Sequence, residues 1–207
     1  MNKKTVMVVD DTKDMVWTVK KVLKSDGYNT MEAGGGLECL QKLYESREKP
    51  DLILLDVMMQ PMDGWVTLKT IKADKKLSSI PVSMMTVIPP TPDIIEGELL
   101  MMFENYITKP FTKTELLNKL HETFEQMDKI NSKYDALINK KAGKVADEYK
   151  HLATEFLRRK RVVEAMKKCS STKLKSGKPI DEVIKNQEEL IWIMEQKIAA
   201  IEHRYGI

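Results

Sequence analysis

The sequence predicts an α/β fold, a doubly wound parallel sheet, followed by an all-α region. Over the first 121 residues, short apolar runs alternate with segments whose apolar residues recur at helical spacing. Strands and helices in alternation are typical of a parallel sheet with helices packed on its faces. Beyond that point, long apolar stripes at helical spacing predict helices alone. We therefore expect a domain over residues 1–121 and a helical output or dimerisation region over 122–207.

Four segments of the first domain are predicted to be buried strands because they are short and apolar on both faces. They cover residues 4–9, 52–55, 82–85 and 106–108. The intervening segments with helical patterns are residues 13–25, 37–45, 65–73 and 94–103. In a sheet of this kind, ligands bind at the carboxyl ends of the strands. The residues that follow each strand are therefore candidates for a functional site.

Polar side chains stand at the ends of these four predicted strands. In chain order they are the pair Asp10 and Asp11, then Asp56, Thr86 and Lys109. Because the carboxyl ends of parallel strands meet at one edge of the sheet, we expect these side chains to share a single crevice.

Three clustered carboxylates repel one another unless a cation lies among them. Oxygen ligands that leave room for water suit Mg²⁺ best, so a magnesium site is expected. Lys109 brings a further cation to the same place, which a divalent metal alone would not require. An anionic group is therefore expected to bind there, and a phosphoryl group fits.

This set of motifs resembles the receiver domain of two-component response regulators, in particular the chemotaxis-regulator-like receivers, from residue 1 to about 121. The resemblance implies a flavodoxin-like, five-stranded (βα)5 fold with Asp56 as the phosphoacceptor and Mg²⁺ as the cofactor. It also implies that Asp11 is a direct metal ligand, that Asp10 acts largely through water, and that the backbone carbonyl of Met58 is another ligand.

The resemblance further assigns a switch to Thr86 and Tyr106. Thr86 and Lys109 would bind the phosphoryl oxygens. The ring of Tyr106 would turn inward when the threonine hydroxyl moves toward the phosphate. A sensor histidine kinase would be the phosphoryl donor, and the protein would assist only its own phosphorylation and dephosphorylation, so it is not expected to be an enzyme acting on an outside substrate.

Composition sets further expectations. No run of 18 apolar residues and no signal peptide is present, so a cytoplasmic protein without membrane partners is expected. The net charge of +3 is unevenly distributed, because residues 139–178 hold 13 basic and 4 acidic side chains. Cys39 and Cys169 have no metal-ligand spacing, and Cys39 is expected to be a buried small residue.

The last helix of the first domain is predicted to extend outward. Thr112 and Glu115 form a capping box, and the helix that they open meets no glycine or proline before Gly143. An apolar stripe runs along this helix. Its members are Leu117, Leu120, Phe124, Met127, Tyr134 and Ile138.

Two more helices of similar length are predicted at about 144–169 and 180–205, with a polar loop between them. Each carries one coiled-coil-like stripe. The stripes consist of Val145, Tyr149, Leu152, Phe156, Val163 and Met166, and of Ile180, Ile184, Ile191, Met194, Ile198 and Ile201. We expect an antiparallel hairpin. Since such a hairpin buries little surface alone, it should pack on the preceding helix or on a second chain, and a homodimer through these helices is expected.

The role of the helical region stays open at this point. No winged-helix or compact helix-turn-helix pattern is present, and the output partner is unknown. Phosphorylation-controlled binding of RNA or DNA through the basic segment 140–178 is an alternative, although a solvated basic face turned toward the acidic third helix or an acidic partner is favoured. A histidine-phosphotransfer-like bundle with His151 or His121 as acceptor is less favoured, because neither histidine lies in a recognisable motif.

Overall fold

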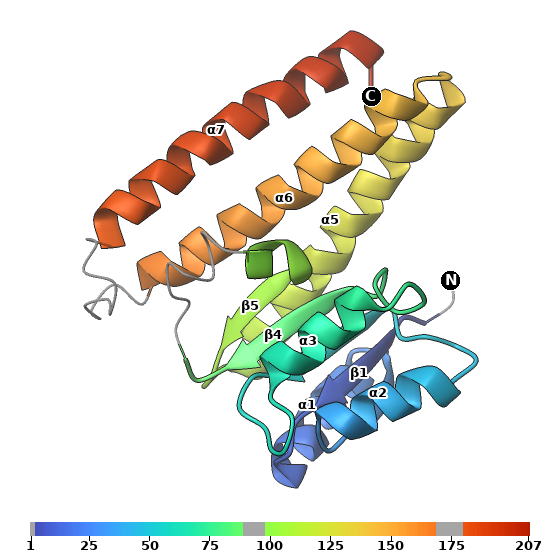
Figure 1. Cartoon of the computed structure of the whole chain (residues 1–207), viewed down its shortest axis with the longest axis vertical. Helices are drawn as coiled ribbons and strands as arrows, with labels where there is room; N and C mark the ends of the chain where they lie inside the picture. The colour runs from blue at the N-terminus through green and yellow to red at the C-terminus, as the bar shows by residue number, and fades with distance from the viewer. Residues whose placement is uncertain (1–2, 89–97, 169–179) are drawn as a thin grey trace. The chain divides into compact units, whose positions relative to one another are not determined.

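The computed structural model describes residues 3–88, 98–168 and 180–207 (Figure 1). These residues divide into two compact units. The first contains the residues up to Ile88 together with Met102–Lys119, and the second contains residues 98–101 together with Leu120–Ile207. Each unit is described by itself below.

The first unit is built around a five-stranded parallel sheet with strand order β2-β1-β3-β4-β5. The strands are β1 (Thr5–Val9), β2 (Asn29–Ala33), β3 (Leu52–Asp56), β4 (Val82–Thr86) and β5 (Asn105–Thr108). Every residue of β3 and β4 is buried, as expected for strands covered on both faces. The predicted doubly wound, flavodoxin-like sheet is confirmed.

Several helices of this unit pack on the sheet, and three of them precede β4 in the described residues. They are α1 (Lys13–Ser25), α2 (Gly36–Glu45) and α3 (Gly64–Ala73). Helix α1 packs against β1 and β2, whereas α2 and α3 lie side by side over one face (Figure 1). Each helix buries part of its apolar stripe, for example Val16, Val19 and Leu23 of α1.

Two features of the first unit differ from the sequence-based expectation. Strand β2 is not among the four predicted segments, because Asn29–Ala33 is an edge strand with half-exposed polar residues and lacks an apolar run. The helix expected at 94–103 is wrong for its described part, where residues Glu98–Met102 form a short 3₁₀ helix. Its end is fixed because the Glu104 amide already donates to the Val82 carbonyl at 2.6 Å as the chain enters β5. Residues 94–97 lie outside the described part.

The second unit is helical, with α5 (Lys113–Asn139, shared with the first unit), α6 (Gly143–Lys168) and α7 (Ile180–Tyr205). Helices α6 and α7 run antiparallel, since Lys167 pairs with Glu188 at one end and Tyr149 bonds to Glu202 toward the other. In the described residues, no helix combines the length and the apolar character that crossing a membrane requires. The predicted helical region after the sheet is confirmed.

The apolar stripe of α5 lies partly on other residues than those predicted. Ile130 and Leu137 enter a core cluster with Ala146 and Tyr149, whereas Ile138 is 42% exposed. Spacing alone cannot tell which of two adjacent apolar residues faces the neighbouring helix. In α6, Tyr149, Val163 and Met166 are buried as expected, and the predicted residues Ile191, Met194, Ile198 and Ile201 of α7 are half-buried. The side chain of Ile180 lies outside the part of the chain that the structure describes.

Cys39 provides a test of the packing of α2. Its side chain is fully buried, and burial raises the pKa of the thiol to about 12. We expect a Cys169→Ser variant to resist modification by a thiol reagent in native buffer up to about pH 10, because the thiolate is the reactive form. Denaturant should make Cys39 react at the rate of a free thiol. Rapid native labelling at pH 8 would contradict this packing.

Candidate functional site

The carboxyl edge of the sheet gathers the polar residues that follow the strands. Asp10 is 1% exposed after β1, Asp56 is 5% exposed as the last residue of β3, and Thr86 is fully buried as the last residue of β4. Lys109 follows β5, and its amide donates to the Thr86 carbonyl at 2.7 Å. Local sequence accounts for this placement, since each residue directly follows an apolar run that must be buried.

Lys109 joins two of the carboxylates. Its Nζ lies 2.7 Å from Asp10 Oδ2 and 3.0 Å from Asp56 Oδ1, and only 11% of its side chain is exposed. An ammonium group at this position offsets the repulsion between two buried carboxylates. The structure thus brings together residues separated by up to 99 positions in the chain.

The three carboxylates fit a metal ion. Oxygen atoms of Asp10, Asp11 and Asp56 all lie within 4.8 Å of one another, and Asp11 is exposed to solvent. Backbone amides hold two of them in place, because Thr12 donates to Asp10 Oδ1 at 2.9 Å and Gln60 donates to Asp11 Oδ2 at 3.3 Å. A set of carboxylate oxygens with one side open to water suits a hard cation such as Mg²⁺.

The pKa of Asp56 is raised by its buried position beside other charged groups. Burial raises the pKa of its carboxyl group, and the charge of Asp10 adds to this, whereas the Lys109 ammonium and a hydrogen bond from the Met58 amide oppose it. Met58 itself is 55% exposed. Its carbonyl as a metal ligand stays a prediction.

Thr86 and Tyr106 are connected through one residue that the sequence did not indicate. The Ile88 amide donates to Thr86 Oγ1 at 3.0 Å, and the Tyr106 hydroxyl donates to the Ile88 carbonyl at 2.8 Å. The Tyr106 ring is 1% exposed, so it lies inward. Because Ile88 participates through its backbone, its side chain gives no signal in the sequence.

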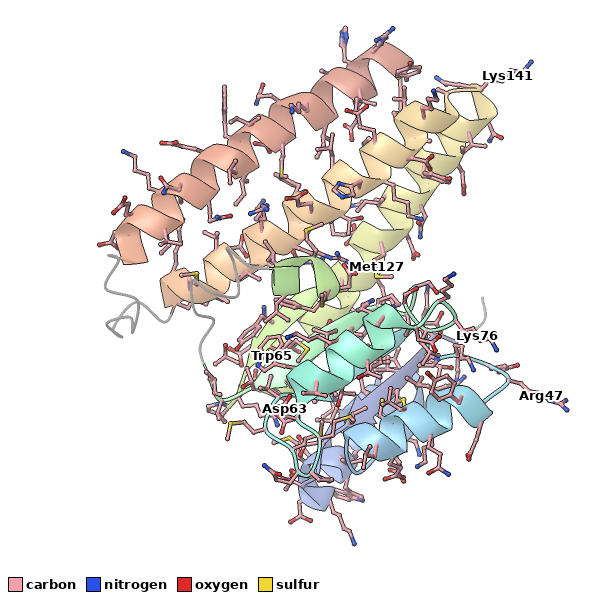
Figure 2. The ribbon with its side chains drawn as sticks, in the orientation of Figure 1. Arg47, Asp63, Trp65, Lys76, Met127 and Lys141 are labelled. Carbon is pink, nitrogen blue, oxygen red and sulfur yellow. The ribbon has the colours of Figure 1, made fainter. Side chains whose placement is uncertain are left out.

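Trp65 is a second residue that the sequence analysis missed. It lies near the start of α3, close to the Asp63 cap (Figure 2). Its ring stacks on Tyr106 with centroids 6.5 Å apart and meets Phe103 at 6.1 Å, and the Phe103 and Tyr106 rings are 6.0 Å apart. The cluster of three rings holds the inward position of Tyr106, and α3 contributes to it from the residues directly after the acceptor loop.

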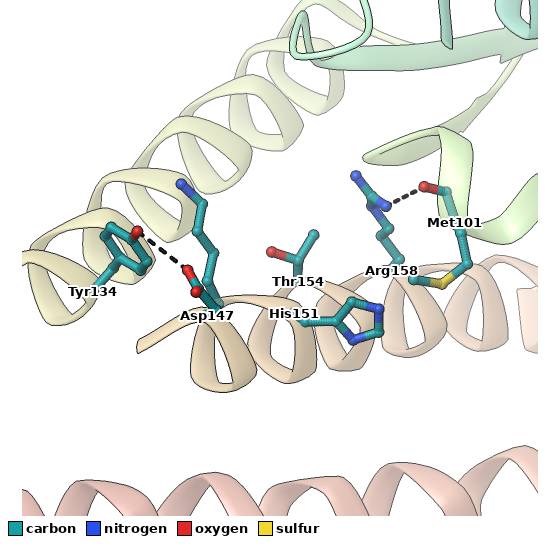
Figure 3. Close-up of a pocket in the computed structure, with 7 residues that line it drawn as sticks. Met101, Tyr134, Asp147, His151, Thr154 and Arg158 are labelled. Carbon is teal, nitrogen blue, oxygen red and sulfur yellow. Dashed lines mark hydrogen bonds between the residues drawn. The ribbon is translucent and has the colours of Figure 1, made fainter. Parts of the chain in front are cut away.

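The two candidate histidines belong to the second unit. His121 is exposed, and His151 has a 68% exposed side chain 3.8 Å from Glu155. His151 borders a pocket of about 370 Å³ in which Tyr134 bonds to Asp147 and Arg158 bonds to the Met101 carbonyl (Figure 3). No acidic cluster for a metal accompanies either histidine in the described residues.

Part of the basic segment makes contacts within its own unit. Arg159 bonds to Glu155 and Gln187, Arg161 is 6% exposed, and Lys167 pairs with Glu188. Lys173, Lys175 and Lys178 lie outside the described residues. Two of these contacts, Arg159 with Gln187 and Lys167 with Glu188, join the segment to the third helix, whereas Lys144, Lys150 and Lys160 are exposed.

Comparison with known proteins gives an independent result. A family model described as the response regulator receiver domain matches residues 6–121. Over 115 residues the chain is 34% identical to Protein PilG of Pseudomonas aeruginosa, a match that covers 56% of this chain and 83% of PilG. Over 116 residues it is 37% identical to the alkaline phosphatase synthesis transcriptional regulatory protein PhoP of Bacillus subtilis, covering 56% of this chain and 46% of PhoP. The match spans about half the length of several of the curated relatives.

Solved structures agree with this result. The chemotaxis protein CheY4 of Vibrio cholerae superimposes with a TM-score of 0.53 at 27% identity, covering 59% of this chain and 99% of CheY4. The family match ends at residue 121, so most of the helical region lies outside it.

Proposed function

The chain belongs to the response regulator receiver family, and we propose that it is a two-component response regulator whose Asp56 accepts a phosphoryl group from the phosphohistidine of a sensor kinase. The observation that carries this proposal is the placement of Asp56, buried among Asp10, Asp11 and Lys109 at the carboxyl edge of the sheet. We infer that the exchange takes place in the cytoplasm.

Transfer would proceed by attack of an Asp56 carboxylate oxygen on phosphorus. The bond from phosphorus to the kinase histidine breaks as the new oxygen to phosphorus bond forms, and the histidine nitrogen leaves with the electron pair. Positioning and charge neutralisation supply most of the catalysis in such a step. Lys109, 3.0 Å from the attacking carboxylate, can turn its ammonium to a phosphoryl oxygen once that group arrives.

Asp10, Asp11 and Asp56, with the Met58 carbonyl, would hold Mg²⁺. When bound, this ion would neutralise charge on the carboxylates and on the incoming phosphoryl oxygens. The chain's own backbone prepares the site, since the amides of Thr12 and Gln60 fix the directions of Asp10 and Asp11.

We propose that the switch runs from Thr86 to Tyr106. A Thr86 hydroxyl that turns to a phosphoryl oxygen gives up the hydrogen bond from the Ile88 amide. Ile88 also accepts from Tyr106, so a shift at Thr86 changes the support of that ring. The output would be a change in assembly or partner binding of the helical region, which joins two copies as a homodimer.

Lys109→Met tests the charge balance of the site. Without the ammonium, two buried carboxylates lose their cation, so the variant should be less stable than wild type in EDTA. Mg²⁺ should therefore raise its melting temperature more than that of wild type, while phosphoryl incorporation falls. Thermal melts with and without Mg²⁺ give the comparison. Equal shifts in both proteins would show that Lys109 does not share the carboxylate site with the ion.

The proposed function is tested by incubating the full chain with acetyl phosphate and Mg²⁺. Intact mass spectrometry should find one added phosphoryl group per chain, and EDTA should prevent its addition. Light scattering after size exclusion, with and without beryllofluoride, then reports on assembly. Absence of incorporation under conditions in which the protein is folded and binds Mg²⁺ would overturn the proposal.

A further inference from the structure

Helix α7 leaves a large apolar group in solvent at its middle. The helix runs from Ile180 to Tyr205, and it buries Val183, Ile184 and Gln187. At its midpoint, however, Leu190 is 42% exposed and Ile193 is 44% exposed. Two exposed aliphatic side chains one turn apart form a small apolar patch, and a partner helix that covers it would remove it from water.

A charged pattern surrounds these apolar residues. Exposed side chains recur every three or four positions on the same face of the helix as Ile193. In chain order they are Glu182, Asn186, Glu189, Ile193, Lys197, Ala200 and Arg204. We call these residues, with Leu190, the outer face of α7. Among the residues that the structure describes, none of its four charged side chains has an ion-pair partner.

The outer face of α7 is complementary to itself. Glu189 and Lys197 lie four residues before and after Ile193, and Glu182 and Arg204 lie eleven residues before and after it. In an antiparallel pair of these helices centred on Ile193, each acidic residue of one copy meets a basic residue of the other. In a parallel pair, like charges would meet instead, which is unfavourable.

We propose that two copies of this chain associate through the outer face of α7, as an antiparallel helix pair on a two-fold axis at Ile193. The contact is isologous, so Glu189 of each copy pairs with Lys197 of the other, and Glu182 pairs with Arg204 in the same way. The apolar centre lies inside these charged pairs, where it is removed from water. This proposal deepens the homodimer in the proposed function, and it does not require phosphorylation, because the face is exposed in the structure described here.

Reversing the charge of one residue at a time tests the pairing of Glu189 with Lys197. Sedimentation equilibrium of the full-length chain without phosphoryl donor should show a dimer that weakens as salt is added. Glu189→Lys and Lys197→Glu each replace two attractive contacts with two repulsive ones, so each variant alone should dimerise about tenfold more weakly or worse. An equimolar mixture of the two variants should regain the wild-type dimer. In the mixed pair, the introduced lysine of one copy faces the introduced glutamate of the other, and the remaining contact is the native Glu189–Lys197 pair.

The control is Glu195→Lys. It makes the same change of charge on the same helix, but position 195 lies about 120° around the helix from Glu189. This variant should keep the wild-type dimerisation constant. A monomeric wild type, a mixture that fails to regain the dimer, or equal weakening by Glu195→Lys would each overturn the antiparallel pairing.

Phosphoryl incorporation by Asp56, measured in the same samples, separates the two proposals. Incorporation without a dimer would reject the α7 pairing and leave the proposed function intact. A dimer that responds to the charge substitutions as expected, in samples without phosphoryl incorporation, would reject the proposed function and leave the α7 pairing intact.

Discussion

Replacing Asp56 with asparagine should abolish phosphoryl incorporation from acetyl phosphate. The amide has the shape of the carboxylate but lacks its negative charge and nucleophilic oxygen, so the bond to phosphorus cannot form. The fold should survive, because Asp56 ends β3 in a buried position where an uncharged group costs less to bury than a charged one. We expect the melting temperature to stay at the wild-type value or above it. Intact mass spectrometry and a thermal melt give the two readouts.

Asp51→Asn is the matched control for this experiment. Asp51 precedes the same strand at its other end, where it accepts a hydrogen bond from the Thr5 amide at 2.7 Å. An asparagine oxygen can accept the same bond, so this variant should incorporate the phosphoryl group like wild type. If Asp56→Asn kept wild-type incorporation, the acceptor would have to be another residue, and Asp10 or Asp11 would be the first to test.

The sheet could be predicted because its inner strands leave a strong local signal. Strands β3 and β4 are buried along their whole length, and their apolar runs lead directly to Asp56 and Thr86. Edge strand β2 gives no such signal, because its polar side chains are exposed to solvent and it has no apolar run. The carboxylate cluster followed from the topology, because parallel strands bring their carboxyl ends to one edge.

The features that could not be predicted from the sequence depend on tertiary contacts. Ile88 links Thr86 to Tyr106 through backbone atoms, which any residue type provides. Trp65 contacts Tyr106 only because the fold brings the start of α3 to β5. In the helical region, Arg161 lies in a run of basic residues that resembles a surface patch, but it is 6% exposed. Charge patterns along a chain do not show which residues another helix covers.

Gly64→Ala is expected to have the largest effect on stability of any alanine replacement of a glycine in the described residues. A Cβ atom at Gly64 would lie 2.1 Å from the Asp56 carbonyl oxygen and 2.8 Å from Val57 Cα. Both neighbours are backbone atoms, and the Gly64 amide is held there by a 2.9 Å hydrogen bond to the Val57 carbonyl. Since neither can rotate away, the end of β3 must shift. We expect a loss of about 3 kcal/mol in the free energy of unfolding.

The same shift should reach the acceptor, because the displaced backbone belongs to Asp56 itself. Phosphoryl incorporation should therefore slow even at temperatures where Gly64→Ala is folded. Gly143→Ala is the control, since a Cβ there meets nothing closer than Ile138 Cδ1 at 4.0 Å, and the loss of unfolded-state freedom should leave stability unchanged or raise it by about 0.5 kcal/mol. Denaturant melts and incorporation rates of both variants give the comparison. A Gly64→Ala protein with wild-type stability would mean that the β3–α3 connection yields to the added methyl group, and that the close approach of Gly64 to the Asp56 carbonyl does not constrain the end of β3.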